Sequence, residues 1–189
     1  MSGIRRFLLA VVFLSQAYPV PAQNLTFYRE DLTFRIEGVY FYVNGVYYLS
    51  SSEPPVSPVT LLYPFPTDSI YSTADSLFIY NLTRNEGIID YIKKKDMVVF
   101  QVGLDTLTAI LISYRQKYHT GEVRYILTTT QNWGKPLEQA NFKLILDKNI
   151  NIVYFSYPPD RFSIFGNTKI YYWEKKNFMP LEDMIFILN

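Results

Sequence analysis

The chemistry open to this chain is limited first by its metal-binding side chains. Its 189 residues include one histidine, His119, and no cysteine. Zinc and copper sites are usually built from several histidine or cysteine ligands. The sequence also lacks the Asp-x-Asp-x-Asp-Gly pattern of a calcium loop. We therefore expect neither a metal nor another cofactor.

His119 is also the one residue of the sequence on which a serine triad could be built. The Gly-x-Ser-x-Gly turn that presents the nucleophile in many hydrolases is absent. His119 follows Tyr118 and precedes the turn signal Thr120-Gly121. We interpret it as a solvated residue at the end of a strand, and a triad stays open as the alternative.

Paired carboxylates are the remaining catalytic possibility, because glycoside hydrolysis needs two acids roughly 5 to 9 Å apart. The chain has 17 acidic residues. Most lie where turns or strand ends are expected and where solvation explains them, as do Glu30, Asp31, Glu86, Asp96, Asp105, Asp147, Asp160, Glu182 and Asp183. The sequence predicts a protein that is not an enzyme, with a glycoside hydrolase-type enzyme as the second alternative.

Aromatic residues are numerous, with 17 tyrosines and 14 phenylalanines. Flat rings on an exposed sheet can stack on sugars, and the candidates for such a face are Tyr40, Tyr42, Tyr47, Tyr171, Tyr172 and Trp173. The structural alternative is cross-strand packing, because aromatic residues have a high strand propensity. A carbohydrate-binding module is therefore the first alternative function.

Trp133 lies in a polar loop, residues 130–138, between two strand-like segments. Gly134 and Pro136 favour a turn in this loop. A tryptophan here either buries its ring and anchors the loop, or faces outward as a stacking platform. We favour the buried anchor. Trp133, Tyr171 and Trp173 are the possible binding or loop-anchoring aromatics.

Residues 1–22 have the pattern of a targeting segment. Arg5 and Arg6 precede an apolar run at residues 7–13, and the stretch closes on Val20-Pro21-Ala22. The run is shorter than the roughly 20 apolar residues that span a bilayer. We predict a signal peptide cleaved after Ala22. The mature chain is then exported, periplasmic or extracellular, and soluble or peripherally associated with the envelope.

The chain beyond this segment shows neither an anchor nor a nucleic-acid surface. It has no cysteine to carry a lipid, and no later stretch is long and apolar enough for a transmembrane segment. The full sequence has 18 basic and 17 acidic residues, and loss of Arg5 and Arg6 leaves 18 − 2 = 16 basic residues and a net charge of about −1. A neutral chain is not typical of nucleic-acid binding. The expected partner is an unknown envelope protein or a glycan.

The elements that would position these residues are strands. Apolar residues recur with period two, as Leu32, Phe34 and Ile36 do around Thr33 and Arg35. Beyond residues 32–49, strands are predicted at residues 59–63, 76–82, 88–92, 97–102, 107–118, 123–129, 140–146, 150–157, 169–173 and 184–188. Short strands at this spacing predict an all-β fold, an antiparallel β-sandwich.

Two stretches have less regular patterns. Residues 32–49 are predicted as a three-strand meander with turns at Glu37-Gly38 and Asn44-Gly45. The alternative makes residues 39–50 one long strand with a bulge at Gly45. A short helix is predicted to begin at residues 136–139.

The chain is long enough for one domain or two small ones. We predict two packed sandwich lobes, residues 23–105 and residues 106–189, with the long strand at residues 107–118 crossing into the second. One undivided domain is the alternative, because no flexible linker or change in composition marks the boundary.

Two stretches resemble known proteins: "VTLLYPFP" at residues 59–66 and "YILTTTQNWGKPLEQANFKLIL" at residues 125–146. They resemble uncharacterised exported bacterial β-sandwich proteins with domains of unknown function and, more distantly, the vault and inter-alpha-trypsin-inhibitor domain. The resemblance implies a cell-envelope protein with a sandwich fold and no catalytic residues to carry over. The predicted function is a non-catalytic exported envelope or interaction module of unknown partner.

Overall fold

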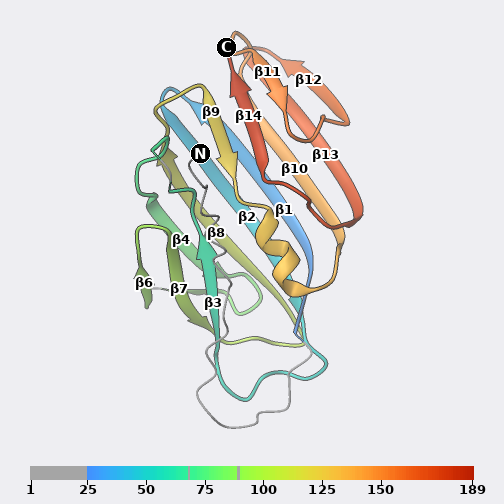
Figure 1. The fold of residues 1–189 in the computed structure, drawn as a ribbon. Coiled ribbons are helices and arrows are strands. Elements are labelled where there is room, and N and C mark those ends of the chain that lie inside the picture. The colour runs from blue at the N-terminus through green and yellow to red at the C-terminus, as the bar shows by residue number, and fades with distance from the viewer. Residues whose placement is uncertain (1–24, 68, 89) are drawn as a thin grey trace, which may run out of the picture.

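The computed structural model describes residues 25–67, 69–88 and 90–189 (Figure 1). The predicted signal peptide, residues 1–22, lies outside this part of the chain. Strands dominate the described residues, whose single helical element is the short 3-10 helix η1 (Thr128–Trp133).

One layer of the fold is an eight-stranded sheet with the strand order β12-β13-β10-β1-β2-β8-β4-β5. β1 and β10 run parallel, whereas the other neighbours in this sheet are antiparallel. Its strands are β1 (Thr26–Glu37), β2 (Tyr40–Ser50), β4 (Asp75–Asn81), β5 (Glu86–Gly87), β8 (Leu107–Lys117), β10 (Leu137–Asp147), β12 (Arg161–Phe165) and β13 (Thr168–Phe178).

The second layer consists of two three-stranded sheets on the same face of the large sheet. Phe186 of one small sheet packs on Phe34 of β1, and Tyr63 of the other packs on Tyr114 of β8. The first small sheet has the order β11-β14-β9 and the second β3-β7-β6. Their strands are β3 (Val59–Pro64), β6 (Tyr91–Lys93), β7 (Met97–Val102), β9 (Glu122–Tyr125), β11 (Ile152–Phe155) and β14 (Met184–Leu188).

The core lies between the two layers and follows from period-two burial. On β8 every second side chain from Thr108 to Gln116 is buried, and β10 alternates in the same way. Phe34, Phe41 and Phe186 are fully buried there, and burial of each such ring contributes about 1.5–3 kcal/mol. The architecture confirms the predicted all-β, sandwich-like fold.

The meander predicted for residues 32–49 is wrong at its second turn. The turn at Gly38 is present, with a φ of 58°, but Asn44 and Gly45 lie inside the long strand β2. The alternative of one long strand is closer, although the pairing of β2 with β1 and β8 runs without a register shift through Gly45. Gly45 is instead a site of close packing, because an added Cβ would meet the Tyr47 ring, with Cζ 2.7 Å away, and Leu32 Cδ2 at 2.8 Å.

Three other predicted elements differ from the structure. The strand predicted at residues 123–129 ends at Tyr125 and gives way to η1, whereas β10 already begins at Leu137, where a helix was expected. The strand predicted at residues 88–92 is replaced by β5 and β6, which belong to different sheets. The edge strand β12 was not predicted.

The predicted lobe boundary at residues 105 and 106 runs through the large sheet. β1, β2, β4 and β5 precede the boundary in the chain, and they share that sheet with β8, β10, β12 and β13, which follow it. The second layer does separate there, because β3, β6 and β7 all precede the boundary, and β9, β11 and β14 follow it.

No helix among the residues that the structure describes has the length and apolar character needed to cross a membrane.

Gly45→Ala is expected to destabilise the fold by about 1–3 kcal/mol, because the new methyl group overlaps the Tyr47 ring and Leu32. Urea denaturation of both proteins measures the loss. Gly87→Ala is the matched control, since an added Cβ there comes no closer than 3.9 Å to the Tyr80 ring, and its effect should stay within about 0.5 kcal/mol. Equal effects at the two positions would contradict the packing role of Gly45.

Candidate functional site

A bulge in β1 brings Phe27 onto the same buried face as the acidic residue Glu30. The pairing of β1 with β2 shifts register between Phe27 and Arg29, so Phe27 and Glu30 both face inward although they are three residues apart. Their exposed fractions are 6% and 2%. From Glu30 onward the alternation is regular, and Leu32 and Phe34 follow on the same buried face.

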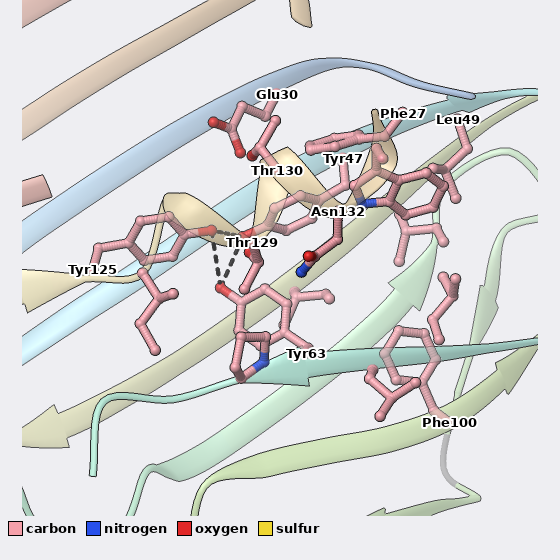
Figure 2. A pocket seen from close by; sticks show the side chains of 17 residues that line it. Phe27, Glu30, Tyr47, Leu49, Tyr63, Phe100, Tyr125, Thr129, Thr130 and Asn132 are labelled. Carbon is pink, nitrogen blue, oxygen red and sulfur yellow. Dashed lines mark hydrogen bonds between the residues drawn. The ribbon is translucent and has the colours of Figure 1, made fainter. Parts of the chain in front are cut away.

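Glu30 lines a cavity of about 100 Å³ at the place where three parts of the fold meet (Figure 2). The large sheet forms the floor through β1, β2 and β8. The sheet of β3 and β7 forms one wall, and β9 with η1 forms the other. The lining residues are Phe27, Glu30, Tyr47, Leu49, Leu61, Leu62, Tyr63, Pro64, Phe100, Ile110, Ile112, Tyr125, Ile126, Thr129, Thr130, Asn132 and Trp133.

η1 is held over the cavity by contacts from the segment that precedes β14. One oxygen of Asp183 accepts hydrogen bonds from the backbone N–H groups of Leu127 and Thr128, each at 3.1 Å, and from the Thr128 hydroxyl at 2.8 Å. The amide of Gln131 donates to the Pro180 carbonyl at 2.7 Å. Gly134 ends the element with a φ of 70°, a conformation that glycine adopts without strain.

Three tyrosine hydroxyls form a closed triangle beside Glu30 (Figure 2). Tyr47 Oη lies 2.8 Å from both Tyr63 Oη and Tyr125 Oη, and the last two are 3.4 Å apart. The three residues come from β2, β3 and β9, one from each sheet. Burial raises the pKa of all three phenols well above 10. The hydroxyls therefore remain neutral and satisfy one another.

Aromatic rings make up much of the rest of the cavity wall. The Phe27 ring centroid lies 6.0 Å from that of Tyr47 and 5.7 Å from that of Trp133. The Tyr47 and Tyr63 centroids are 5.6 Å apart. Asn132 lines the same cavity but is exposed, and Trp133 is half-buried. These two residues of η1 therefore mark the side that faces solvent.

Glu30 is the chemically unusual group of the site. Its buried Oε1 atom has no hydrogen-bond partner among the described residues. Burial, with a smaller contribution from the charge of Asp31, raises the pKa of the Glu30 carboxyl to about 8. At neutral pH the side chain is mainly a neutral acid, and loss of its proton leaves a charge in an apolar surrounding.

The sequence interpretation of Glu30 was wrong. It placed Glu30 with Asp31 among the solvated acids of turns and strand ends, whereas only Asp31 reaches the outer face. There Asp31 accepts hydrogen bonds from Arg29 at 2.7 Å, Tyr48 at 3.0 Å and Asn141 at 2.6 Å. The period-two pattern of Leu32, Phe34 and Ile36, extended two residues toward the N-terminus, was the signal that could have identified Glu30.

The three aromatics selected from the sequence occupy different places. Trp133 lines the cavity and packs on Phe27. Trp173 is fully buried on β13, where its indole N–H donates to the Tyr157 carbonyl at 2.7 Å. Tyr171, two residues before Trp173 on the same strand, is partly buried against Phe155 with ring centroids 5.0 Å apart. The structure brings Trp133 to Glu30 and leaves the other two outside the cavity.

The tyrosines of the outer face are covered by cations. The guanidinium of Arg115 lies 4.7 Å from the Tyr40 ring centroid, that of Arg35 lies 4.4 Å from the Tyr42 centroid, and that of Arg161 lies 3.8 Å from the Tyr172 centroid. Cation–π contacts of this kind contribute about 0.5–1 kcal/mol each at exposed sites. A sugar ring would have to displace the guanidinium groups from these ring faces.

His119 has a serine partner that the sequence did not identify. Ser72 Oγ lies 2.9 Å from His119 Nε2, and the pair is exposed. Among the described residues no carboxylate is hydrogen-bonded to His119, so the orienting third member of a triad is missing there. The same part of the chain holds no cluster of three histidine, cysteine, aspartate or glutamate residues that could bind a metal ion.

No protein-family model and no curated protein sequence matches this chain. Solved structures do match its fold. A proposed nutrient-binding protein of Legionella pneumophila superposes with a TM-score of 0.67 and 13% identity, over 88% of this chain and 67% of that protein. An M1 zinc metallopeptidase of Deinococcus radiodurans gives a TM-score of 0.52 at 7% identity, and a mutant of it gives 0.54 at 8%.

These likenesses show the fold alone. The chain spans 42% of the length of the metallopeptidases, and its sequence contains one histidine, so no zinc site is carried over from them. The resemblance to exported bacterial sandwich proteins and to the vault and inter-alpha-trypsin-inhibitor domain stays a prediction.

The folded protein should lose stability as the pH rises from about 5 to about 8. Over this range the unfolded chain has already released the Glu30 proton, near pH 4.5, while the folded chain retains it up to about pH 8. The unfolded state therefore binds fewer protons, and each pH unit costs up to about 1.4 kcal/mol. Urea denaturation at pH 5.5, 7 and 8.5 measures the slope.

Glu30→Gln should remove most of this slope and leave the protein more stable than the wild type at pH 8.5, because it leaves no charge to bury. Glu138→Gln is the control, since Glu138 is exposed on β10. A wild-type slope that persists in Glu30→Gln would show that another group is responsible.

Proposed function

We propose that this chain is a non-catalytic binding module that holds a small molecule in the cavity under η1. The observation that carries the proposal is the buried Glu30 carboxyl, which lines the cavity and has no protein partner for Oε1. Buried polar atoms in folded proteins are nearly always hydrogen-bonded, so an unpaired one needs an explanation. A bound molecule would supply the missing partner.

The composition of the cavity supports binding. Its wall is mainly aromatic and aliphatic, with a few polar groups from Glu30, Thr129, Thr130 and Asn132. Ligand sites are typically concave and apolar with a small number of fixed polar groups. The hydroxyl triangle of Tyr47, Tyr63 and Tyr125 ties the walls together, so the site is preorganised.

The same geometry favours binding over catalysis. Among the described residues Glu30 is the single acid that lines the cavity, so the second carboxylate of a glycoside hydrolase is absent from it. The Ser72–His119 pair is exposed and lies outside the cavity lining. We therefore retain the non-catalytic role and extend the interaction module expected from the sequence to small-molecule binding.

Export of the module remains part of the proposal. It is supported by the charged and apolar pattern of residues 1–22. The similar fold of the proposed nutrient-binding protein is compatible with a binding role. The alternative of a carbohydrate-binding surface lacks a comparable observation, because the outer-face rings of Tyr40, Tyr42 and Tyr172 are covered by guanidinium groups.

Leu61→Trp should abolish binding, because Leu61 lines the cavity from β3 and a larger ring there fills the space. Saturation-transfer NMR with 1-butanol, n-butylammonium, butyrate and benzene detects binding to the wild type. Thr60→Trp is the matched control, since Thr60 is exposed on the opposite face of the same strand. Circular dichroism and urea denaturation verify that both variants fold.

Two results would contradict the proposal. One is that none of the four probes binds the wild-type protein. The other is that a probe binds Leu61→Trp as well as it binds Thr60→Trp, which would place the binding site elsewhere.

A further inference from the structure

We propose that the cavity is specific for a small organic ammonium ion, held by the Glu30 carboxylate and by the faces of the surrounding aromatic rings. This inference rests on the proposed function, because it names the ligand class of the same site. A largely apolar cavity could also admit neutral or anionic molecules. We propose that this cavity prefers a cation to both.

The first argument is the charge of the lining. Among the described residues the cavity is lined by one acid and by no lysine, arginine or histidine. An anionic ligand would therefore meet no countercharge and would face Glu30. A cation finds in Glu30 an oxygen that no protein group has engaged. A charge-assisted hydrogen bond of this kind is roughly twice as strong as one between neutral groups.

The second argument is the arrangement of the rings. Phe27, Tyr47 and Trp133 line the same small space, and the Phe27 centroid lies within 6.0 Å of both of the others. The face of an aromatic ring attracts a cation placed within about 6 Å of its centroid, and tryptophan does so most strongly. A cavity lined by these rings and by a carboxylate favours an ammonium group over a neutral group of equal size.

The third argument concerns size. The cavity has a volume of about 100 Å³, whereas an engineered cavity of about 150 Å³ in another protein admits benzene. A ligand with about four to six non-hydrogen atoms is therefore the appropriate scale. This limit excludes a sugar ring with its hydroxyl groups and points to a short alkylammonium ion.

Binding of the cation must be linked to release of one proton. The ammonium ion enters with its charge, the Glu30 carboxyl gives its proton to solvent, and the buried site stays neutral overall. Because the pKa of the free carboxyl is about 8, affinity for the cation should increase about tenfold between pH 7 and pH 9. A neutral ligand that accepts a hydrogen bond from the protonated carboxyl would show the opposite dependence.

Few other groups near Glu30 titrate in this range. Tyr47 faces it from β2, Tyr63 from β3 and Tyr125 from β9, and burial keeps the pKa of each phenol above 10. The nearest acid is Asp31, on the opposite face of β1, where Arg29, Tyr48 and Asn141 hold it. A change in affinity between pH 7 and pH 9 is therefore assigned to Glu30.

The test compares n-butylammonium with its neutral isostere 1-butanol and with butyrate. NMR titration in phosphate buffer, which contains no competing amine, is performed at pH 6, 7 and 9. The amine keeps its proton throughout, as a lysine side chain does, with a pKa of about 10.4. We expect n-butylammonium to bind at least tenfold more tightly than 1-butanol at pH 9, to weaken about 100-fold by pH 6, and butyrate not to bind.

Glu30→Gln should weaken n-butylammonium at least tenfold at pH 9 and remove the pH dependence of its binding. Glu138→Gln should bind all three probes as the wild type does. If 1-butanol binds the wild type as tightly as n-butylammonium at pH 9, or if the ammonium ion binds Glu30→Gln equally well, the cation specificity is wrong while the binding module stands. If no probe binds, the proposed function fails as well.

Discussion

Two small sheets have to cover one face of a sheet that is much wider than either of them, and this constraint shapes the rest of the molecule. β11-β14-β9 and β3-β7-β6 lie against the inner face of the eight-stranded sheet, and η1 lies in front of β1 and β2 between them (Figure 1). No strand pairing joins the two small sheets across the seam between them, so side chains alone have to fill it. The seam is consequently where the interior contains hydroxyl groups, a carboxyl and a cavity.

The hydroxyl triangle of Tyr47, Tyr63 and Tyr125 closes this seam with one residue from each sheet. The Tyr47 ring reaches it by lying across Gly45 of its own strand, a position that only a residue without a Cβ leaves open. A glycine inside a strand normally weakens it. Here the hydrogen bonds that Tyr47 makes to two other sheets offset that cost, so Gly45 and Tyr47 are best understood as one structural unit.

The sheets could be predicted from the sequence because their signal is local. Alternating burial on β8 and β10 follows directly from alternating apolar residues. η1 could not be predicted in this way, because three consecutive threonines favour a strand. What fixes η1 is Asp183, more than fifty residues further along the chain, which accepts three hydrogen bonds from Leu127 and Thr128. The edge strand β12 was missed because all five of its residues are exposed, so burial imposes no pattern on it.

The burial of Glu30 and the cavity beside it could not be predicted from the local sequence pattern alone. The parity of Glu30 with Leu32 and Phe34 indicated a buried side chain, but an acid in a strand is more often interpreted as an exposed one. The cavity itself depends on the bulge between Phe27 and Arg29 and on pairings that join β1 to β2 and bring β3 and β9 over them. None of these is visible as a motif, so the sequence could identify Trp133 as a notable residue without indicating what it faces.

The neighbouring acids Glu30 and Asp31 have opposite environments in this fold. Asp31 has three hydrogen-bonding partners within 3.0 Å on the outer face, whereas Glu30 has none for Oε1 on the inner face. A leucine at position 30 would satisfy the core at lower cost, since an unpaired buried carboxyl is destabilising in either protonation state. Natural proteins tolerate such groups mainly where activity requires them. The energetic deficit at Glu30 is therefore more readily explained by a ligand than by the folding of the chain alone.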